Sequence, residues 1–257
     1  MTSHLDFATQ LARDTGELLL SFFRTPKVNA TRKADWSVLT EADLAADRLL
    51  TARIHEAYPN DQIISEEAAA TYSGPQTATW IIDPLDGTSN FSVGFVHWGV
   101  SIARVENGRT TTAALFFPLL NELFTAERGQ GAYRNGEAIH TVPYTGQPAA
   151  FFACGSGVYR DYDVRVRYKP RMFGSSAYNF CAVACGYAVY GLDTTPKVWD
   201  IAASWLVLEE AGGALASMQD ALFPLKSGFN YHKRAFPTLG AANEEMLKVG
   251  REKIRLR

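Results

Sequence analysis

The fold of this chain is decided by a segment that reads Trp-Ile-Ile-Asp-Pro-Leu-Asp-Gly-Thr-Ser-Asn-Phe, residues 80–91. Its apolar start predicts a buried strand that leads into Asp83, and Pro84 fixes φ, so the strand cannot continue regularly. The bend brings Asp83 and Asp86 together beside backbone carbonyls, which is an all-oxygen environment suited to Mg²⁺. Gly87 permits an unusual backbone conformation, and Thr88 begins a run of capping residues at a helix start, where N–H groups attract phosphate. Taken alone, the segment also fits an Asp-Pro and Asp-Gly turn of the kind common in loops.

The segments on either side predict a mixed α and β fold in layers. Short apolar runs at residues 62–65 and 79–82 end abruptly in acidic residues, which is typical of buried strands that deliver carboxylates to a sheet edge. Asn-Gly pairs at 107–108 and 135–136 divide residues 96–140 into an antiparallel meander. Helical periodicity covers residues 3–24, 42–58, 175–190, 199–211 and 243–254. We place a weak subdomain boundary near residues 141–147, which gives an N-terminal α+β subdomain over 1–145 and a C-terminal α/β subdomain over 146–257.

Composition narrows the class of protein. The chain has 257 residues, of which 47% are hydrophobic and 20% charged, and its formal net charge is −2. Nucleic-acid surfaces are built from clustered Lys and Arg, so we expect no nucleic-acid partner. No apolar run approaches the ~20 residues that span a bilayer, and the first residues lack a secretory pattern, so we expect no membrane association. The three cysteines, Cys154, Cys181 and Cys185, form no zinc pattern, and we interpret them as small buried hydrophobes of a cytoplasmic protein.

Residues 83–91 resemble the DPxDGTxxF signature of the inositol monophosphatase family. Residues 33–43 resemble that family's lysine-containing mobile loop, which is followed by Thr-x-x-Asp, and residues 64–67 resemble its strand-ending Glu-Glu pair. Residues 100–103, 122–126 and 128–132 resemble its central meander, and residues 199–203 resemble its second signature, Trp-Asp-x-Ala-Ala. The resemblance runs from the first helix to the last and implies the αβαβα sandwich of inositol monophosphatases and fructose bisphosphatases.

The resemblance implies a set of metal ligands. Glu66, Asp83 and the carbonyl of Leu85 would hold a first Mg²⁺, and Asp83, Asp86 and Asp200 a second. Glu66 would also touch a third, weaker ion. Independently, four converging carboxylates repel one another and have raised pKa values unless positive charge balances them. Each acid also has a plainer interpretation; Asp200, for example, could be the first-turn acid of a helix.

The resemblance also implies roles around these ligands. Asp43 and Thr88 resemble the pair that activates the attacking water, with Glu66 as the third catalytic residue, and Gly87 and Thr88 would hold the phosphate. Lys33 lies on the mobile loop. Asp43 is three residues after Thr40, so a capping box is an alternative role for it. Two ions would activate water and stabilise the leaving alkoxide, so we predict hydrolysis of a phosphate monoester.

Substrate choice is expected further along the chain. Ser176 lies at the helix start that touches the sugar ring in the family, and Asp193 stands where inositol-specific relatives place a Glu. Because Asp is one methylene shorter, inositol monophosphate, a related sugar or polyol phosphate, histidinol phosphate and fructose 1,6-bisphosphate all stay open. Asp193 could instead cap the turn before Pro196. We expect a homodimer, and a catalytically silent binding protein is the alternative from another class.

Overall fold

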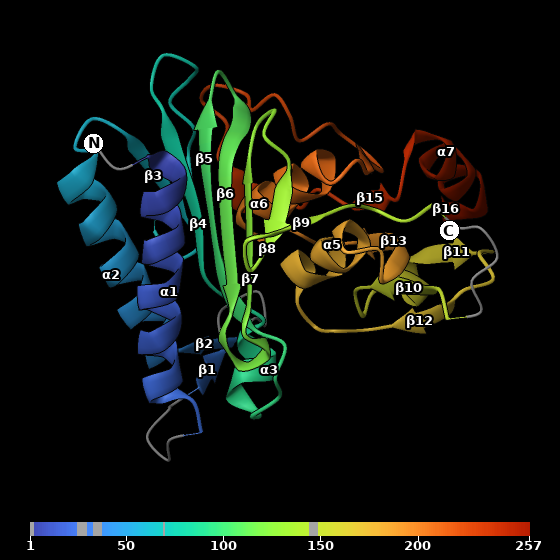
Figure 1. Ribbon diagram of the computed structural model, residues 1–257, viewed down its shortest axis with the longest axis horizontal. Coiled ribbons are helices and arrows are strands. Elements are labelled where there is room, and N and C mark those ends of the chain that lie inside the picture. Colours follow the sequence, from blue (N-terminus) through green and yellow to red (C-terminus); the bar gives the residue numbers. More distant parts are fainter. Residues whose placement is uncertain (1–2, 25–29, 33–37, 69, 144–148) are drawn as a thin grey trace.

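The computed structural model describes residues 3–24, 30–32, 38–68, 70–143 and 149–257. Two main sheets and three layers of helices alternate across the molecule, as Figure 1 shows, with the N-terminal helices on one side and the last helix on the other. The predicted layered αβαβα class is therefore confirmed.

The larger sheet has seven strands in the order β3-β4-β5-β6-β7-β8-β9, with only β3 and β4 parallel. The predicted meander is confirmed, and its Asn-Gly turns have the left-handed backbone that such hairpins require, with φ of 51° at Asn107 and 52° at Asn135. The strands are β3 (Gln62–Ser65), β4 (Thr79–Asp86), β5 (Gly99–Glu106), β6 (Arg109–Phe117), β7 (Glu122–Glu127), β8 (Ala132–Arg134) and β9 (Glu137–Ile139).

Helices cover both faces of this sheet, which explains why every residue of β4 is buried. On one face lie α1 (His4–Phe22) and α2 (Glu41–Ala57), close to their predicted bounds. Ser3 caps α1 by accepting a hydrogen bond from the Asp6 N–H at 3.0 Å. On the other face α6 (Val198–Glu210) packs against β4, β5, β6 and β7. The strand that carries the acidic motif is thus held between two layers of helix.

The smaller sheet has five strands in the order β12-β10-β13-β15-β14. Its inner face packs on α5 (Ser176–Ala184), which lies beside α6, and its outer face on α4 (Val158–Asp161) and α7 (Glu244–Lys253). The strands are β10 (Phe151–Cys154), β12 (Lys169–Arg171), β13 (Ala188–Asp193), β14 (Ala214–Ser217) and β15 (Thr238–Ala241). The smaller elements are β1 (Ala30–Arg32), β2 (Val38–Thr40), α3 (Thr88–Ser92), η1 (Pro118–Leu120), β11 (Tyr162–Val164), η2 (Tyr231–Lys233) and β16 (Ile254–Leu256).

The helix predicted over residues 175–190 is wrong in its second half. The helix α5 ends at Ala184, and Gly186 adopts a left-handed φ of 70°, which an L-residue with a side chain rarely adopts. The chain then forms β13, which lies at the centre of the smaller sheet and is buried along its whole length. A strand buried on both faces shows no alternation of polar residues, so its apolar run resembles a helix.

Candidate active site

The end of β4 is bent where the sequence predicts it. Asp83 pairs with Ser101 and Asp86 with Gly99, so Pro84 and Leu85 interrupt the ladder between them. The Leu85 N–H donates to Asp83 Oδ1 at 3.0 Å, which closes a short turn and fixes the carboxylate. Gly87 follows with φ of 86°, and a Cβ atom there would lie 2.7 Å from the His97 carbonyl oxygen. Only glycine fits this position.

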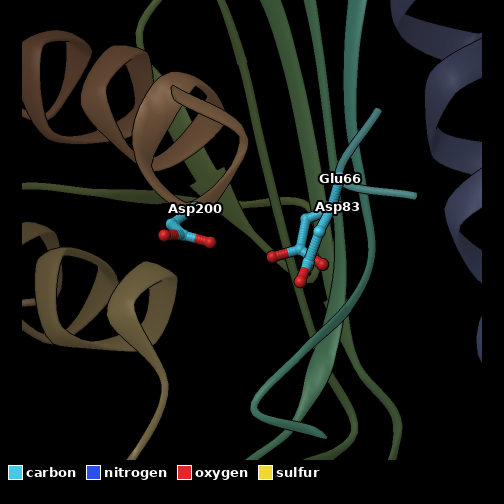
Figure 2. Close-up of side chains that lie close together, drawn as sticks. All are labelled: Glu66, Asp83 and Asp200. Carbon is cyan, nitrogen blue, oxygen red and sulfur yellow. The ribbon is translucent and has the colours of Figure 1, made fainter. Parts of the chain in front are cut away.

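Three carboxylates from distant parts of the chain meet beside this bend. Ligand oxygens of Glu66, Asp83 and Asp200 all lie within 4.8 Å of one another. Figure 2 shows Glu66 and Asp83 on the side of the larger sheet and Asp200 facing them from the start of α6. Asp200 is fixed because the Lys197 N–H donates to its Oδ2 at 2.6 Å, and Ser101 on β5 donates to the Trp199 carbonyl at 3.3 Å.

The cluster is electrostatically unfavourable without a cation. Burial raises the pKa of Asp83 well above its usual range, and the negative charges of Glu66 and Asp200 raise it further. The pKa of Asp200 is raised well above its usual range as well, by burial and then by Glu66. Negative charge on these buried, converging carboxylates is unfavourable without a balancing cation. Converging oxygen ligands are also the donor set that a divalent cation such as Mg²⁺ prefers. These residues therefore fit a metal ion.

Asp86 lines the same cavity as these three acids. Its carboxylate, however, is held by hydrogen bonds from the start of α5. Ser175 donates its hydroxyl to Asp86 Oδ2, and the Ser176 N–H donates to Oδ1 at 3.2 Å. Burial raises the pKa of Asp86 to about 7, and the two hydrogen bonds oppose this rise. Asp86 is thus adjacent to the three clustered acids without being one of them.

Asp43 and Thr88 form a hydrogen-bonded pair next to the bend. The Thr88 hydroxyl lies 2.9 Å from Asp43 Oδ1 and 2.9 Å from the Leu85 carbonyl oxygen. Asp43 also makes the capping box with Thr40, because its Oδ2 accepts the Thr40 N–H at 2.8 Å. Burial raises the pKa of Asp43 despite these bonds. The capping role and the contact with Thr88 therefore coexist, one on each carboxylate oxygen.

Apart from Asp43, which is buried and reaches the site through its hydrogen bond with Thr88, these groups border one cavity of about 970 Å³. Its wall includes several residues to which the sequence analysis gave no site role, among them His232. Lys197 and Arg160 bring positive charge to the wall. No motif marks these positions; they reach the cavity through the tertiary fold. The lining is Glu66, Glu67, Asp83, Leu85, Asp86, Gly87, Thr88, Ser89, Ser156, Arg160, Gly174, Ser176, Thr195, Lys197, Trp199, Asp200, His232 and Ala235.

Asp193 lies behind the cavity wall rather than in it. The residue is 7% exposed, and its carboxylate accepts hydrogen bonds from the Ser176 hydroxyl at 2.7 Å and the Thr195 N–H at 3.4 Å. The first bond links it to a residue of the cavity, and the second is the turn cap considered as its alternative role. Lys33 lies outside the described residues.

Comparison with known proteins places the chain in a family. The model of the inositol monophosphatase family matches residues 1–248. The chain belongs to the inositol monophosphatase family. Among curated proteins of the family, Nus factor SuhB of Escherichia coli K12 is 34% identical over 224 residues, which cover 82% of this chain and 84% of SuhB. Inositol monophosphatase 2 of Solanum lycopersicum is 33% identical over 246 residues, 88% of this chain and 91% of that protein.

Solved inositol monophosphatases share the whole fold. The Thermotoga maritima IMPase has a TM-score of 0.79 at 29% identity and covers 98% of both chains. The family resemblance inferred from the two signatures is thus confirmed, and phosphatase character is shown at the level of the family. Among the described residues, no helix is long and apolar enough to cross a membrane.

Proposed function

We propose that this chain is a Mg²⁺-dependent phosphomonoesterase that hydrolyses a small polyol or sugar phosphate. The observation that supports it most is the convergence of Glu66, Asp83 and Asp200 within 4.8 Å, from a β-strand end, a neighbouring turn and a helix start. A phosphate monoester is itself anionic, and these carboxylates would repel it. Cations in the cluster would remove that repulsion and attract the phosphate.

Glu66, Asp83, Asp86, Asp200 and the Leu85 carbonyl would hold two or three Mg²⁺ ions. When bound, the ions supply Lewis-acid activation of water and electrostatic stabilisation of the leaving oxygen. The protein itself supplies orientation, since in-line displacement at phosphorus requires little more than positioning and charge stabilisation.

Thr88 and Asp43 are suited to orient the attacking water. The Thr88 hydroxyl has one hydrogen and two acceptors at 2.9 Å, Asp43 Oδ1 and the Leu85 carbonyl oxygen. When that hydrogen points to either acceptor, the Thr88 oxygen keeps lone pairs for a hydrogen bond from water. With its hydrogen directed at Asp43 Oδ1, Thr88 can give that hydrogen to Asp43 and take the proton that the water loses, and the raised pKa of Asp43 suits it to receive the proton. Gly87 and Thr88 line the cavity where the phosphate would lie.

The substrate class follows from the size and wall of the cavity. A volume of about 970 Å³ accepts a phosphorylated ring with room to spare. Ser176 would contact substrate hydroxyls, with Asp193 behind it, and Arg160 and Lys197 offer charge for a second anionic group. Inositol monophosphate is one member of this class, and histidinol phosphate and fructose 1,6-bisphosphate are the alternatives.

The test is turnover of a panel of sugar, polyol, nucleotide and amino-alcohol phosphates with Mg²⁺ and with excess chelator. We expect phosphate release from at least one polyol or sugar ester, loss of release in chelator, and loss of release in Asp83→Asn. Undiminished hydrolysis in chelator would refute the metal-dependent mechanism.

A second candidate comes from the bacterial relatives named Nus factor SuhB, to which similarity extends over 82% of this chain. A role of that kind, or another binding role on this scaffold, requires no turnover. Asp83→Asn separates the two, because it should abolish hydrolysis and leave a binding role intact.

The cytoplasmic location expected from the sequence is part of the same proposal. The three cysteines are free, and two of them are buried, as is usual where thiols stay reduced. The proposed homodimer is supported only by the family resemblance. The acidic cavity fits the proposed small phosphate ester, with cations bound, rather than a membrane or a nucleic acid.

A further inference from the structure

Asn90 joins two segments that are far apart in the sequence. Its Nδ2 donates to the His97 carbonyl at 2.6 Å and to the Phe173 carbonyl at 2.7 Å, so both amide hydrogens are used. Carbonyl oxygens only accept, which fixes the orientation of the amide by chemistry. The side chain therefore fastens α3, which follows the acidic motif, to the residue that precedes Gly174.

Gly174 shows how closely the chain passes this amide. It has φ of 74°, and a Cβ atom on it would lie 2.7 Å from Asn90 Oδ1. The next residue, Ser175, caps α5 by accepting the Tyr178 N–H at 3.0 Å and donates its hydroxyl to Asp86. The place of the α5 start is thus set two residues after the Asn90 contact.

These contacts form a closed circuit. From Asp86 the chain runs through Gly87 and Thr88 to Asn90, crosses by the amide to Phe173, continues to Ser175 and Ser176, and returns to Asp86 by two hydrogen bonds. Ser176 also donates to Asp193 at 2.7 Å, so the circuit orients that carboxylate as well. Among the described residues, the bond from Asn90 to the Phe173 carbonyl is the only side-chain hydrogen bond between α3 and residues 173–176.

We propose that Asn90 is a positioning residue, which holds the start of α5 so that Asp86 and Ser176 face the cavity in the geometry needed for cation and substrate. This rests on the proposed phosphatase function. Asn90 touches neither reacting group, and it acts through Phe173, Ser175 and Ser176. Outer contacts of this kind typically change metal affinity or activity by about 10- to 100-fold when removed.

The test compares Asn90→Ala and Asn90→Asp with the matched control Asn135→Asp. Asn135 is also a clamp, with Nδ2 donating to the Asn121 carbonyl at 2.8 Å and Oδ1 accepting the Leu123 N–H at 2.9 Å, but it lies in the meander. Two readouts are needed: the Mg²⁺ concentration for half-maximal turnover, and the Mg²⁺ concentration that gives half of the thermal stabilisation without substrate.

We expect both Mg²⁺ midpoints to rise about 10-fold in Asn90→Ala and further in Asn90→Asp, whose carboxylate would face two carbonyl oxygens. Asn135→Asp should shift either midpoint by less than about 2-fold, even where its melting temperature falls, because substitutions at distant sites without shared partners act independently. Amide hydrogen exchange in the metal-free protein should be faster at residues 175–178 in the Asn90 variants and unchanged there in the control.

A double-mutant cycle with Ser175→Ala identifies the route. If Asn90 acts through Ser175, the effect of Asn90→Ala shrinks in the Ser175→Ala background. Unchanged Mg²⁺ midpoints and unchanged exchange at 175–178 in Asn90→Ala would overturn the proposal. If wild type hydrolyses no ester, but exchange at residues 175–178 is still faster in the Asn90 variants than in wild type, the phosphatase function is refuted and the positioning role is kept.

Discussion

Asp83→Asn should stabilise the metal-free protein while abolishing turnover. Asp83 is 1% exposed, and its Oδ1 accepts the Leu85 N–H, a bond that the Asn oxygen retains. The substitution therefore removes a buried negative charge and leaves the turn at the end of β4 intact. If Asp83 were a structural acid, the same substitution would lower the stability of the metal-free protein, because it would remove a favourable contact.

The size of the effect follows from the cluster geometry. Two unit charges at the 4.8 Å limit of the cluster repel by about 3.5 kcal/mol at an effective dielectric constant of about 20. Glu66 and Asp200 are half-buried, and solvent screening and partial protonation reduce that figure, so we expect a gain of about 1–3 kcal/mol at pH 8. For a chain of this size this corresponds to a rise of roughly 3–9 °C in Tm.

The assay is thermal unfolding at pH 8 in chelator, with Asp61→Asn as the control. Asp61 accepts hydrogen bonds from the Trp80 indole at 3.0 Å and from Arg104 Nε at 3.2 Å, so its neutralisation should lower Tm. Wild type should gain stability from Mg²⁺, and Asp83→Asn should gain much less. A fall in Tm for Asp83→Asn in chelator would show that Asp83 is structural and would refute the ligand assignment.

Three further outcomes are expected. Because the folded-state pKa of Asp86 is raised to about 7, this group contributes stability that is fully present below pH 4 and lost as the pH rises through about 7. Thermal unfolding in chelator should show this loss, and the increase in Tm caused by Mg²⁺ should be larger at pH 8 than at pH 5. Thr88→Ala should lower kcat by about 10²- to 10³-fold with KM little changed, whereas Ser92→Ala, which removes an exposed hydroxyl from the same helix, should keep wild-type kcat. Asp193→Ala should raise KM or shift the preference among sugar phosphates, by roughly 5- to 150-fold in kcat/KM, with unchanged Mg²⁺ dependence, and Asp193→Glu should favour inositol phosphate. Equal loss on every substrate together with a lower Tm would show that Asp193 only caps the turn.

The sequence predicted the parts of the fold that depend on local pattern. The bend at Asp83-Pro84, the Asn-Gly hairpins and the amphipathic first helix are each encoded by neighbouring residues, and each is present. The strand β13 and its partner β15 were missed, because short strands buried on both faces have neither alternation nor length to distinguish them.

The candidate site was predictable only in part for the same reason. Its acidic residues stand in motifs and could be named, whereas Lys197 and His232 reach the cavity only through tertiary packing. The hydrogen bond from Ser175 to Asp86 depends on how the start of α5 packs against the larger sheet, which no local sequence pattern specifies. The expected mobile loop at Lys33 lies outside the described residues and stays a prediction.

The position of α6 has a consequence for synthesis of the chain. This helix belongs to the C-terminal subdomain proposed from the sequence, residues 146–257. It nevertheless covers one face of β4, β5, β6 and β7, which belong to the N-terminal subdomain. A nascent chain that ends before residue 198 would leave that apolar face open, and a chain truncated near residue 145 should aggregate rather than fold. Asp200 arrives with the same helix, so the last carboxylate of the cluster joins the others in the step that closes the core. The repulsion that Asp200 adds to the cluster therefore arises only once burial of α6 can offset it.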